Sequence, residues 1–127
     1  MKTQEAKCEI DSEGTKRWHL NGEIHREDGP ACEFASGFKS WFLHGKLHRE
    51  DGHAVEYASG YRKDWYINGI RHREDGPAIV CSDGVELWFI NGKQLTEKEI
   101  NKKEKEFNIK RSTHYEQTNL FSDGSVC

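Results

Sequence analysis

The sequence predicts a mainly β protein, a single domain of antiparallel β-hairpin repeats that ends in a short α-helix. Three observations predict this class. The first is an internal repeat with a period of 23 or 24 residues, marked by the tryptophans at 18, 41, 65 and 88. The second is a turn signal, Asn-Gly or His-Gly, three residues after each of these tryptophans. The third is a charged, amphipathic segment that follows the last repeat.

The composition favours a thin fold over a thick globular core. Of the 127 residues, 34% are hydrophobic and 32% are charged, yet four Trp, six Phe and four Tyr argue against disorder. The net charge of −3 provides no basic face for nucleic acid. No apolar run is long enough to span a membrane. Nucleic acid and membrane are therefore not the expected partners.

The first residues, MKTQEAKCEI, lack the apolar stretch that a secretory signal needs, so the expected location is cytoplasmic. The cysteines at 8, 32, 81 and 127 form no CxxC pair, and we expect free thiols in a reducing compartment. Cys32 and Cys81 stand at strand positions that other repeats fill with apolar residues. We therefore expect these two to pack as small hydrophobic side chains.

The repeats divide the chain into two parts. Residues 1–95 form the predicted β array, and residues 96–127 form the predicted C-terminal helix and a tail. The units of the array, aligned on their tryptophans, are 12–34, 35–57, 58–81 and a partial 82–95. Such units bury their apolar face only against neighbours, so the array needs caps. The tail at 108–127 is either a last strand pair or a segment that becomes ordered in a complex.

Each unit carries signals for three turns and for the strands between them. A β-prone run such as Trp-Phe-Leu at 41–43 precedes the Asn-Gly pair, which predicts a type I′ turn because both central residues need a positive φ. In the second unit His44 replaces the Asn, and His is among the few residues enriched in that conformation. An Asp-Gly turn, a short strand such as 31–34 and a third, Gly-containing turn complete the unit.

Alternation along the strands predicts two faces. Each Trp shares a face with the Leu or Ile two residues later, and we expect this face to be buried along one antiparallel ribbon. Phe42, Tyr66 and Phe89 point the other way and are expected to form an exposed aromatic stripe that binds a partner. Alternatively, the terminal helix or a second copy of the chain covers this second stripe.

The segment after the array predicts an α-helix over about 97–107. Thr96 fits the N-cap of a capping box, and Glu99 fits its third helical position. Leu95 and Ile100 fit the hydrophobic staple across that cap. One narrow apolar stripe among lysines and glutamates suits a helix that lies over the end of a sheet.

The string His-Arg-Glu-Asp-Gly occurs three times, at 25–29, 48–52 and 72–76, and contains residue types suited to catalysis. An active site is normally one asymmetric constellation, whereas three equally spaced copies have three similar environments. We therefore predict an architectural role. His would serve in packing or turn hydrogen bonds, Arg in ion pairs with the next unit, and Asp-Gly as a turn.

Two chemical alternatives stay open for this motif. A column of His25, His48 and His72 could bind a metal, although structural zinc ligands usually lie closer together in sequence. His with Asp or Glu could act in catalysis, although no nucleophile stands in a familiar catalytic motif. We accordingly expect no catalytic residue, no metal site and no cofactor.

The residues expected to bind a partner combine the outward aromatic stripe, the arginines of the motif and the histidines that break the repeat. The second unit departs from the others at His44 and at His53, which stands where the first and third units have proline. The expected binding residues are Phe42, Tyr66, Phe89, His44, His53, Arg26, Arg49 and Arg73.

The frame Trp-x-x-Asn-Gly-Lys-x-His, followed by two Gly-containing turns around a short strand, resembles MORN repeats over residues 12–95. This resemblance implies successive β-hairpins in a ribbon or solenoid, and a scaffold that contacts lipid or protein. The longer His-Arg-Glu-Asp-Gly-Pro-Ala form resembles uncharacterised repeat proteins of tailed phages and large DNA viruses. It implies a viral protein in the host cytoplasm. Some bacterial relatives of MORN-type proteins imply an antitoxin-like role.

The expected function is that of a non-enzymatic repeat module that binds another protein. The viral resemblance implies a sharper version, an inhibitor of a host defence protein. One alternative is a protein that sequesters a small molecule such as a nucleotide, with arginines on the phosphates and aromatic rings on the base. Others are a scaffold or antitoxin-like binding protein and, least favoured, an enzyme that acts on a polymer. The partner's identity and the oligomeric state, a homodimer included, stay open.

Overall fold

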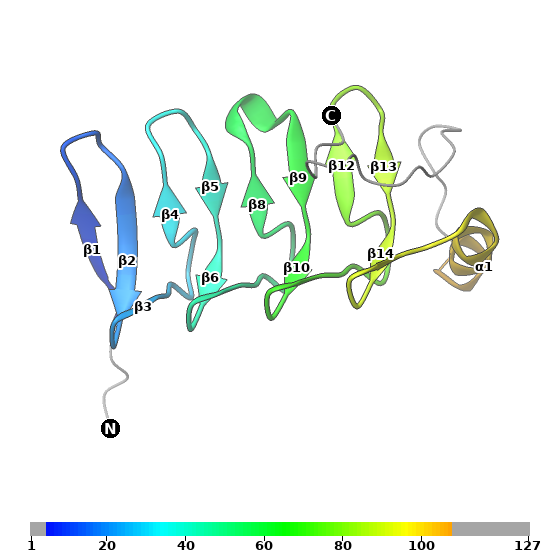
Figure 1. The fold of residues 1–127 in the computed structure, drawn as a ribbon, viewed down its shortest axis with the longest axis horizontal. Helices are drawn as coiled ribbons and strands as arrows, with labels where there is room; N and C mark the ends of the chain where they lie inside the picture. Colours follow the sequence, from blue (N-terminus) through cyan, green and yellow to red (C-terminus); the bar gives the residue numbers. More distant parts are fainter. Residues whose placement is uncertain (1–4, 108–127) are drawn as a thin grey trace.

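The computed structural model of the chain describes residues 5–107. The strand pair considered for 108–127 lies outside the described residues. Within them the fold is mainly β, with antiparallel hairpins followed by one C-terminal helix, as predicted (Figure 1).

Nine strands form the main sheet, in which all neighbours are antiparallel. Its order is β1-β2-β4-β5-β8-β9-β12-β13, with β3 also paired to β2 (Figure 1). The strands are β1 (Lys7–Ile10), β2 (Lys16–Leu20), β3 (Glu23–Ile24), β4 (Cys32–Glu33), β5 (Lys39–Ser40), β8 (Val55–Glu56), β9 (Arg62–Asp64), β12 (Ile79–Cys81) and β13 (Glu86–Leu87).

Three separate two-stranded hairpins follow β5, β9 and β13 along the chain. They are β6 (Phe42–Leu43) with β7 (Lys46–Leu47), β10 (Tyr66–Ile67) with β11 (Ile70–Arg71), and β14 (Phe89–Ile90) with β15 (Lys93–Gln94). One 3₁₀ turn, Ala58–Gly60, connects β8 to β9. The prediction of one continuous ribbon is therefore wrong in detail, because the chain leaves the main sheet before each of these hairpins.

Tryptophan stands at each of these departures. The N–H of Trp41 donates to the carbonyl of Ala54 across the main sheet at 2.7 Å. Its own carbonyl accepts the N–H of His48 on the opposite side at 3.0 Å. Trp65 makes the equivalent bonds to Ala78 and His72. Each Trp backbone thus joins two different strand partners, and the ladder divides at that residue.

The predicted hairpin turns are confirmed. Asn21, His44, Asn68 and Asn91 have φ between 48° and 51°, and the glycine after each has φ between 79° and 83°. Two consecutive residues at positive φ define the type I′ turn. His44 adopts the same backbone conformation as the three asparagines, so its imidazole replaces the Asn side chain without a change of turn.

The predicted faces hold only in part, because Trp88 is fully buried as expected but Phe89, assigned to the exposed stripe, is buried as well. The buried face carries a row of directly opposed residues, namely Cys32, Ser40, Val55, Asp64, Ile79 and Leu87. Phe89, the first residue of β14, is only 4% exposed and packs in the same core cluster as Ile79 and Leu87. Phe42 and Tyr66 hold the equivalent places and are half-buried. The expected exposed stripe is therefore absent at Phe89, because this ring belongs to the buried core cluster.

The opposite face of the main sheet carries a charge ladder that the sequence did not suggest. Its directly opposed residues alternate between basic and acidic over five strands, in the order Lys16, Glu33, Lys39, Glu56 and Lys63. Opposite charges on facing strands stabilise a sheet by roughly 0.2–1 kcal/mol per pair. This ladder fixes which face meets water, and it lies in the strands rather than in the HREDG motif.

The C-terminal helix is confirmed as α1 (Glu97–Phe107). The N–H of Thr96 donates to Glu99 Oε1 at 3.0 Å, and the N–H of Glu99 donates to Thr96 Oγ1 at 3.3 Å, which is a capping box. The pKa of the Glu99 carboxyl is lowered, mainly by the hydrogen bond from the backbone N–H of Thr96 and then by the bond from its hydroxyl. Ile100 is fully buried against Trp88 and Leu95, so α1 covers the last repeat.

The cysteines follow the prediction only in part. Cys32 is a buried free thiol, and burial raises its pKa. Cys8 is free and exposed. Cys81 is buried as expected but is disulfide-bonded, so the free-thiol prediction is wrong there. Over residues 5–107, no helix has the length and apolar character that crossing a membrane requires.

Candidate binding surface

Each HREDG motif (25–29, 48–52 and 72–76) connects its own unit to the next through its histidine. Nδ1 of the imidazole accepts the backbone N–H of the first residue of the next hairpin turn. The three bonds, each 2.9 Å long, run from His44 to His25, from Asn68 to His48 and from Asn91 to His72. The predicted turn hydrogen bond is confirmed, and it joins neighbouring units.

This bond sets the tautomer of the three imidazoles. A ring that accepts at Nδ1 carries its proton at Nε2 when it is neutral. Nε2 lies 3.3–3.5 Å from the carboxylate of the Glu two residues later, in the pairs His25–Glu27, His48–Glu50 and His72–Glu74. Each histidine is thus held between a backbone donor of one unit and a carboxylate of its own.

The arginine of each motif folds back over the tryptophan of its own unit. The guanidinium carbons of Arg26, Arg49 and Arg73 lie 3.9, 4.2 and 4.1 Å from the ring centroids of Trp18, Trp41 and Trp65. In each motif Nε donates to the Asp two residues on, and Nη1 donates to the carbonyl four residues on. The predicted ion pair between units is wrong, because the Asp of the same motif is already within reach.

The glycine of the motif leaves room for this arginine. Gly29, Gly52 and Gly76 have no positive φ, unlike the hairpin glycines. A Cβ at these positions would approach the guanidinium carbon to 2.9, 3.1 and 2.8 Å. The Asp-Gly pair therefore does more than turn the chain, since the missing side chain lets Arg lie between glycine and tryptophan.

Three open grooves lie along the row of motifs. The first, of about 470 Å³, is lined by Trp18 and the first motif. The second, of about 580 Å³, lies between the first and second motifs beside Trp41. The third, of about 710 Å³, lies between the second and third motifs beside Trp65 and Phe107. Each groove thus combines a tryptophan, arginines and carboxylates.

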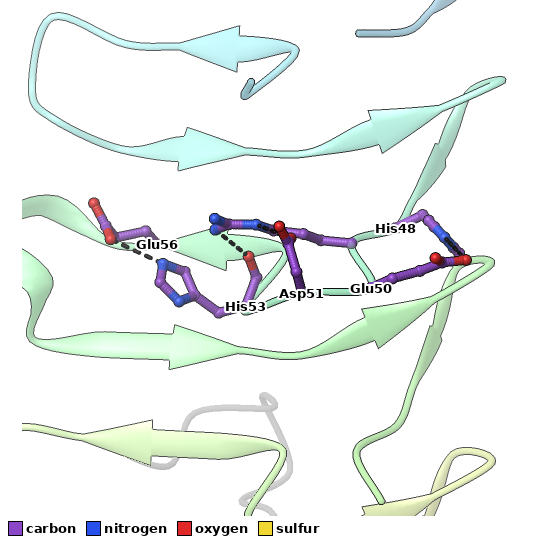
Figure 2. A network of polar contacts seen from close by, with 6 residues as sticks. His48, Glu50, Asp51, His53 and Glu56 are labelled. Carbon is purple, nitrogen blue, oxygen red and sulfur yellow. Dashed lines mark hydrogen bonds and ion pairs between the residues drawn. The ribbon is translucent and has the colours of Figure 1, made fainter. Parts of the chain in front are cut away.

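The second groove has an acidic surplus. Glu27, Asp28, Glu50 and Asp51 line it together with only two arginines. Both arginines are paired with the aspartates. Glu27 and Glu50 are not paired with these arginines. Glu50 is 85% exposed and lies beside Nε2 of His48 (Figure 2). A ligand that complements this groove therefore carries positive charge.

A lysine of α1 lies beside the third groove. Nζ of Lys103, on α1, lies 3.7 Å from Glu74 and 5.3 Å from the centroid of Phe107. Phe107 lines the groove itself. A basic and an aromatic side chain from the helix thus meet the third motif. Among the described residues, none from α1 lines the first or second groove.

The two unmatched histidines of the second unit have different surroundings. His44 is exposed at its turn and stacks at 4.4 Å on the ring of His25. His53 lies between the rings of Trp41 and Trp65, edge to face at 5.6 and 5.5 Å. Its Nε2 lies 2.9 Å from Glu56 Oε1 (Figure 2). His53 therefore fills the place of the proline and connects two tryptophans.

His53 makes stability depend on pH. Burial lowers the pKa of the imidazole below 6.5, against the opposing effect of Glu56, with smaller contributions from Arg49 and Lys63. The unfolded chain therefore binds this proton first as pH falls through 6.5. The contribution of neutral His53 is complete above that value and is lost below it. Denaturant unfolding from about pH 7.5 to about pH 5 is expected to show a larger loss in the wild type than in His53→Pro. Equal losses would contradict this account.

Sequence reasoning missed a polar network around Asp64, on the buried face of the main sheet. Arg62 donates to Asp64 through Nε at 2.8 Å and through Nη2 at 2.9 Å, and both side chains are buried. Arg71 lies 3.4 Å from the same carboxylate and donates to the hydroxyl of Tyr66. A signal was present, because the extra residue of the third unit falls in this segment, between 60 and 65.

Within residues 5–107, no group of three or more His, Cys, Asp and Glu side chains is arranged to hold a metal ion. The three motif histidines each bond to a different turn, so they do not converge on one point. No protein-family model, curated protein or solved structure matches this chain.

Proposed function

We propose that this protein is a MORN-like repeat array that works as a non-enzymatic binding module. Its ligand is an extended segment of another protein that carries basic and aromatic side chains. The observation that carries the proposal is the row of grooves, in which exposed carboxylates surround a tryptophan. The recurrence of the same His, Arg and Gly contacts in three units supports the repeat array.

A lysine and an aromatic ring beside the third groove support the chemistry of the ligand. Lys103 lies 3.7 Å from Glu74 and 5.3 Å from the ring centroid of Phe107, and Phe107 lines the groove together with Glu74 and Trp65. The first and second grooves have matching tryptophans and glutamates. A partner that supplies a lysine or arginine beside an aromatic ring would repeat the contacts that Lys103 makes with Glu74 and Phe107. A cation close to the face of an aromatic ring is also attracted by the ring itself.

The spacing of the units supports an extended ligand. Each unit adds two strands to the main sheet, so neighbouring grooves lie about 10 Å apart. A polyproline II segment rises about 3.1 Å per residue with three residues per turn, so every third side chain returns to the same side after about 9 Å. A ligand with a basic residue at every third position matches this spacing.

A labelled peptide of Lys-Pro-Pro repeats tests the proposal by fluorescence polarisation. It is expected to bind at low ionic strength and to weaken with salt. The double variant Glu27→Gln, Glu50→Gln should bind roughly three- to tenfold more weakly, because two charge pairs are lost. The matched control is Glu13→Gln, Glu106→Gln, whose exposed carboxylates lie outside the three grooves.

Two outcomes would overturn the proposal. Equal binding by both double variants would remove the grooves as the site. Equal binding of a peptide with the same composition but with Lys at every second position would remove the spacing argument.

The resemblance to viral repeat proteins supports a more specific partner, a host defence protein that binding inhibits. Expression of the wild-type chain would then raise the plating of a phage restricted by that defence. The Glu27→Gln, Glu50→Gln variant would raise it less. The nucleotide-binding alternative is less well supported, because the arginines Arg26, Arg49 and Arg73 already donate to aspartates and carbonyls of their own motifs.

A further inference from the structure

The two ends of the main sheet differ in how far they are covered. At the C-terminal end, the residue after β13 is Trp88, which lies fully buried under Ile100 of α1. At the other end, among the strands of residues 5–107, β1 pairs only with β2 (Figure 1). All four residues of β1 are exposed, and Ile10 is 63% exposed. An uncovered edge strand without proline or bulge is a template for pairing with another strand.

The backbone groups of β1 that are free to pair can be identified from the register. Cys8 lies opposite Trp18. Trp18 donates its N–H to Ala31 and accepts the N–H of His25, so both of its groups point away from β1. Opposite residues in an antiparallel pair share their hydrogen-bonding state. The N–H and carbonyl of Cys8 therefore point outward, and so do those of Ala6 and Ile10, two residues away on either side.

The sequence of this edge is complementary to itself. An antiparallel pairing of two β1 strands about a twofold axis at Cys8 sets Lys7 opposite Glu9 of the second copy, and Glu9 opposite its Lys7. It also sets Ala6 against the exposed Ile10. The next pair outward, Glu5 with Asp11, is like-charged, which confines the pairing to residues 6–10.

We propose that the exposed edge of β1 is a self-association site, through which two copies of this chain join their main sheets with Cys8 at the centre. Apart from Ala6, which also lines the first groove, residues 6–10 lie outside the three grooves, and the proposal does not depend on the proposed function. The pairing is short, so the dimer is weak and depends on concentration. Cys8 reports the register, because directly opposed residues of a hydrogen-bonded pair lie about 5.5 Å apart at Cα, within the range of a disulfide.

Charge exchange tests the proposal in sedimentation equilibrium on the full chain. Lys7→Glu and Glu9→Lys each replace two attractive pairs by two repulsive ones and should weaken the dimer roughly tenfold or more. The double variant Lys7→Glu, Glu9→Lys restores self-complementarity and should recover it. An equimolar mixture of the two single variants should form a heterodimer as tight as the wild type. Thermal unfolding of each variant checks that the fold is kept.

Mild oxidation with diamide gives an independent readout of register. The wild type should form a disulfide-linked dimer on a non-reducing gel, and Cys8→Ser should not, although it still dimerises in solution. A chain that stays monomeric at every concentration overturns the proposal. So does a dimer that the single charge variants leave unchanged, since the contact would then lie elsewhere.

Discussion

Replacing Asp64 by Asn is expected to lower the free energy of unfolding by about 3–5 kcal/mol. The carboxylate is almost fully buried and accepts two hydrogen bonds from the buried guanidinium of Arg62. An amide of nearly the same shape leaves that guanidinium without its counter-ion in a site that water does not reach. Urea unfolding at neutral pH measures the loss, provided that the slope of the transition is unchanged.

Two further variants make this result specific. Asp51→Asn also breaks an Arg–Asp pair, but Asp51 is 87% exposed, so the loss should stay below about 1 kcal/mol. The double variant Arg62→Met, Asp64→Leu removes both buried charges and should recover much of the stability, since apolar residues often replace a buried ion pair without loss. If Asp64→Asn cost no more than Asp51→Asn, the buried pair would not be a determinant of stability.

Trp88→Ala is expected to cost about 3–5 kcal/mol, because it leaves a large cavity beneath α1. Trp88 is fully buried and packs against Leu95 and Ile100. Within 97–107, Ile100 is the one buried residue of the helix. We therefore expect the helix to lose its attachment along with the core. Far-ultraviolet circular dichroism and denaturant unfolding would follow the two effects.

Trp18→Ala is the matched control for this prediction. Trp18 holds the equivalent place in the first unit but is only half-buried, under the guanidinium of Arg26. Its removal should cost about 1–3 kcal/mol and leave the helix signal unchanged. Equal losses for the two variants would show that α1 does not act as a cap.

The comparison of these two tryptophans explains what the motif does in the fold. In the first three units an arginine covers the tryptophan ring. The fourth unit has no HREDG motif, and Leu95 and Ile100 take the place of the arginine. The motif is therefore a polar cover for an aromatic ring that would otherwise face water. In the fourth unit the aliphatic side chains of Leu95 and Ile100 cover the tryptophan instead, and α1 follows.

Local signals in the sequence predicted the local structure well. The Asn-Gly turns and the capping box each depend on residues within a few positions of one another, and each was confirmed. The role of the motif histidines as turn partners was also predicted. Which turn they reach was not, because that turn belongs to the next unit, 19 or 20 residues later.

The prediction of an exposed face failed at Phe89 for a physical reason. Alternation states that Trp88 and Phe89 lie on opposite faces, but it does not state which face is covered. We assigned the larger ring to the interior. In the first three units, however, the tryptophan ring is covered by an arginine, which long-range folding of the motif brings there. Hydrophobicity alone therefore could not choose between the two faces.

The candidate binding surface was predicted only in its components. Arg26 and Arg49 were expected to bind a partner directly, yet each donates within its own motif. The exposed groups are the glutamates beside them, Glu27 and Glu50, whereas sequence reasoning expected a ladder of ion pairs between the motifs of neighbouring units. The ladder exists, but in the strands, where lysines and glutamates oppose one another by register. Register is a property of paired strands and is not written in any one of them.

The sequence by itself determined the repeat, its turns and its terminal helix, because each of these follows from short-range sterics and hydrogen bonding. The tertiary structure decided which ring is covered by arginine, where the grooves lie and which edge of the sheet stays open. Those features depend on contacts between units about two dozen residues apart. The repeat specifies that such contacts recur, but only the packed sheet brings their partners together.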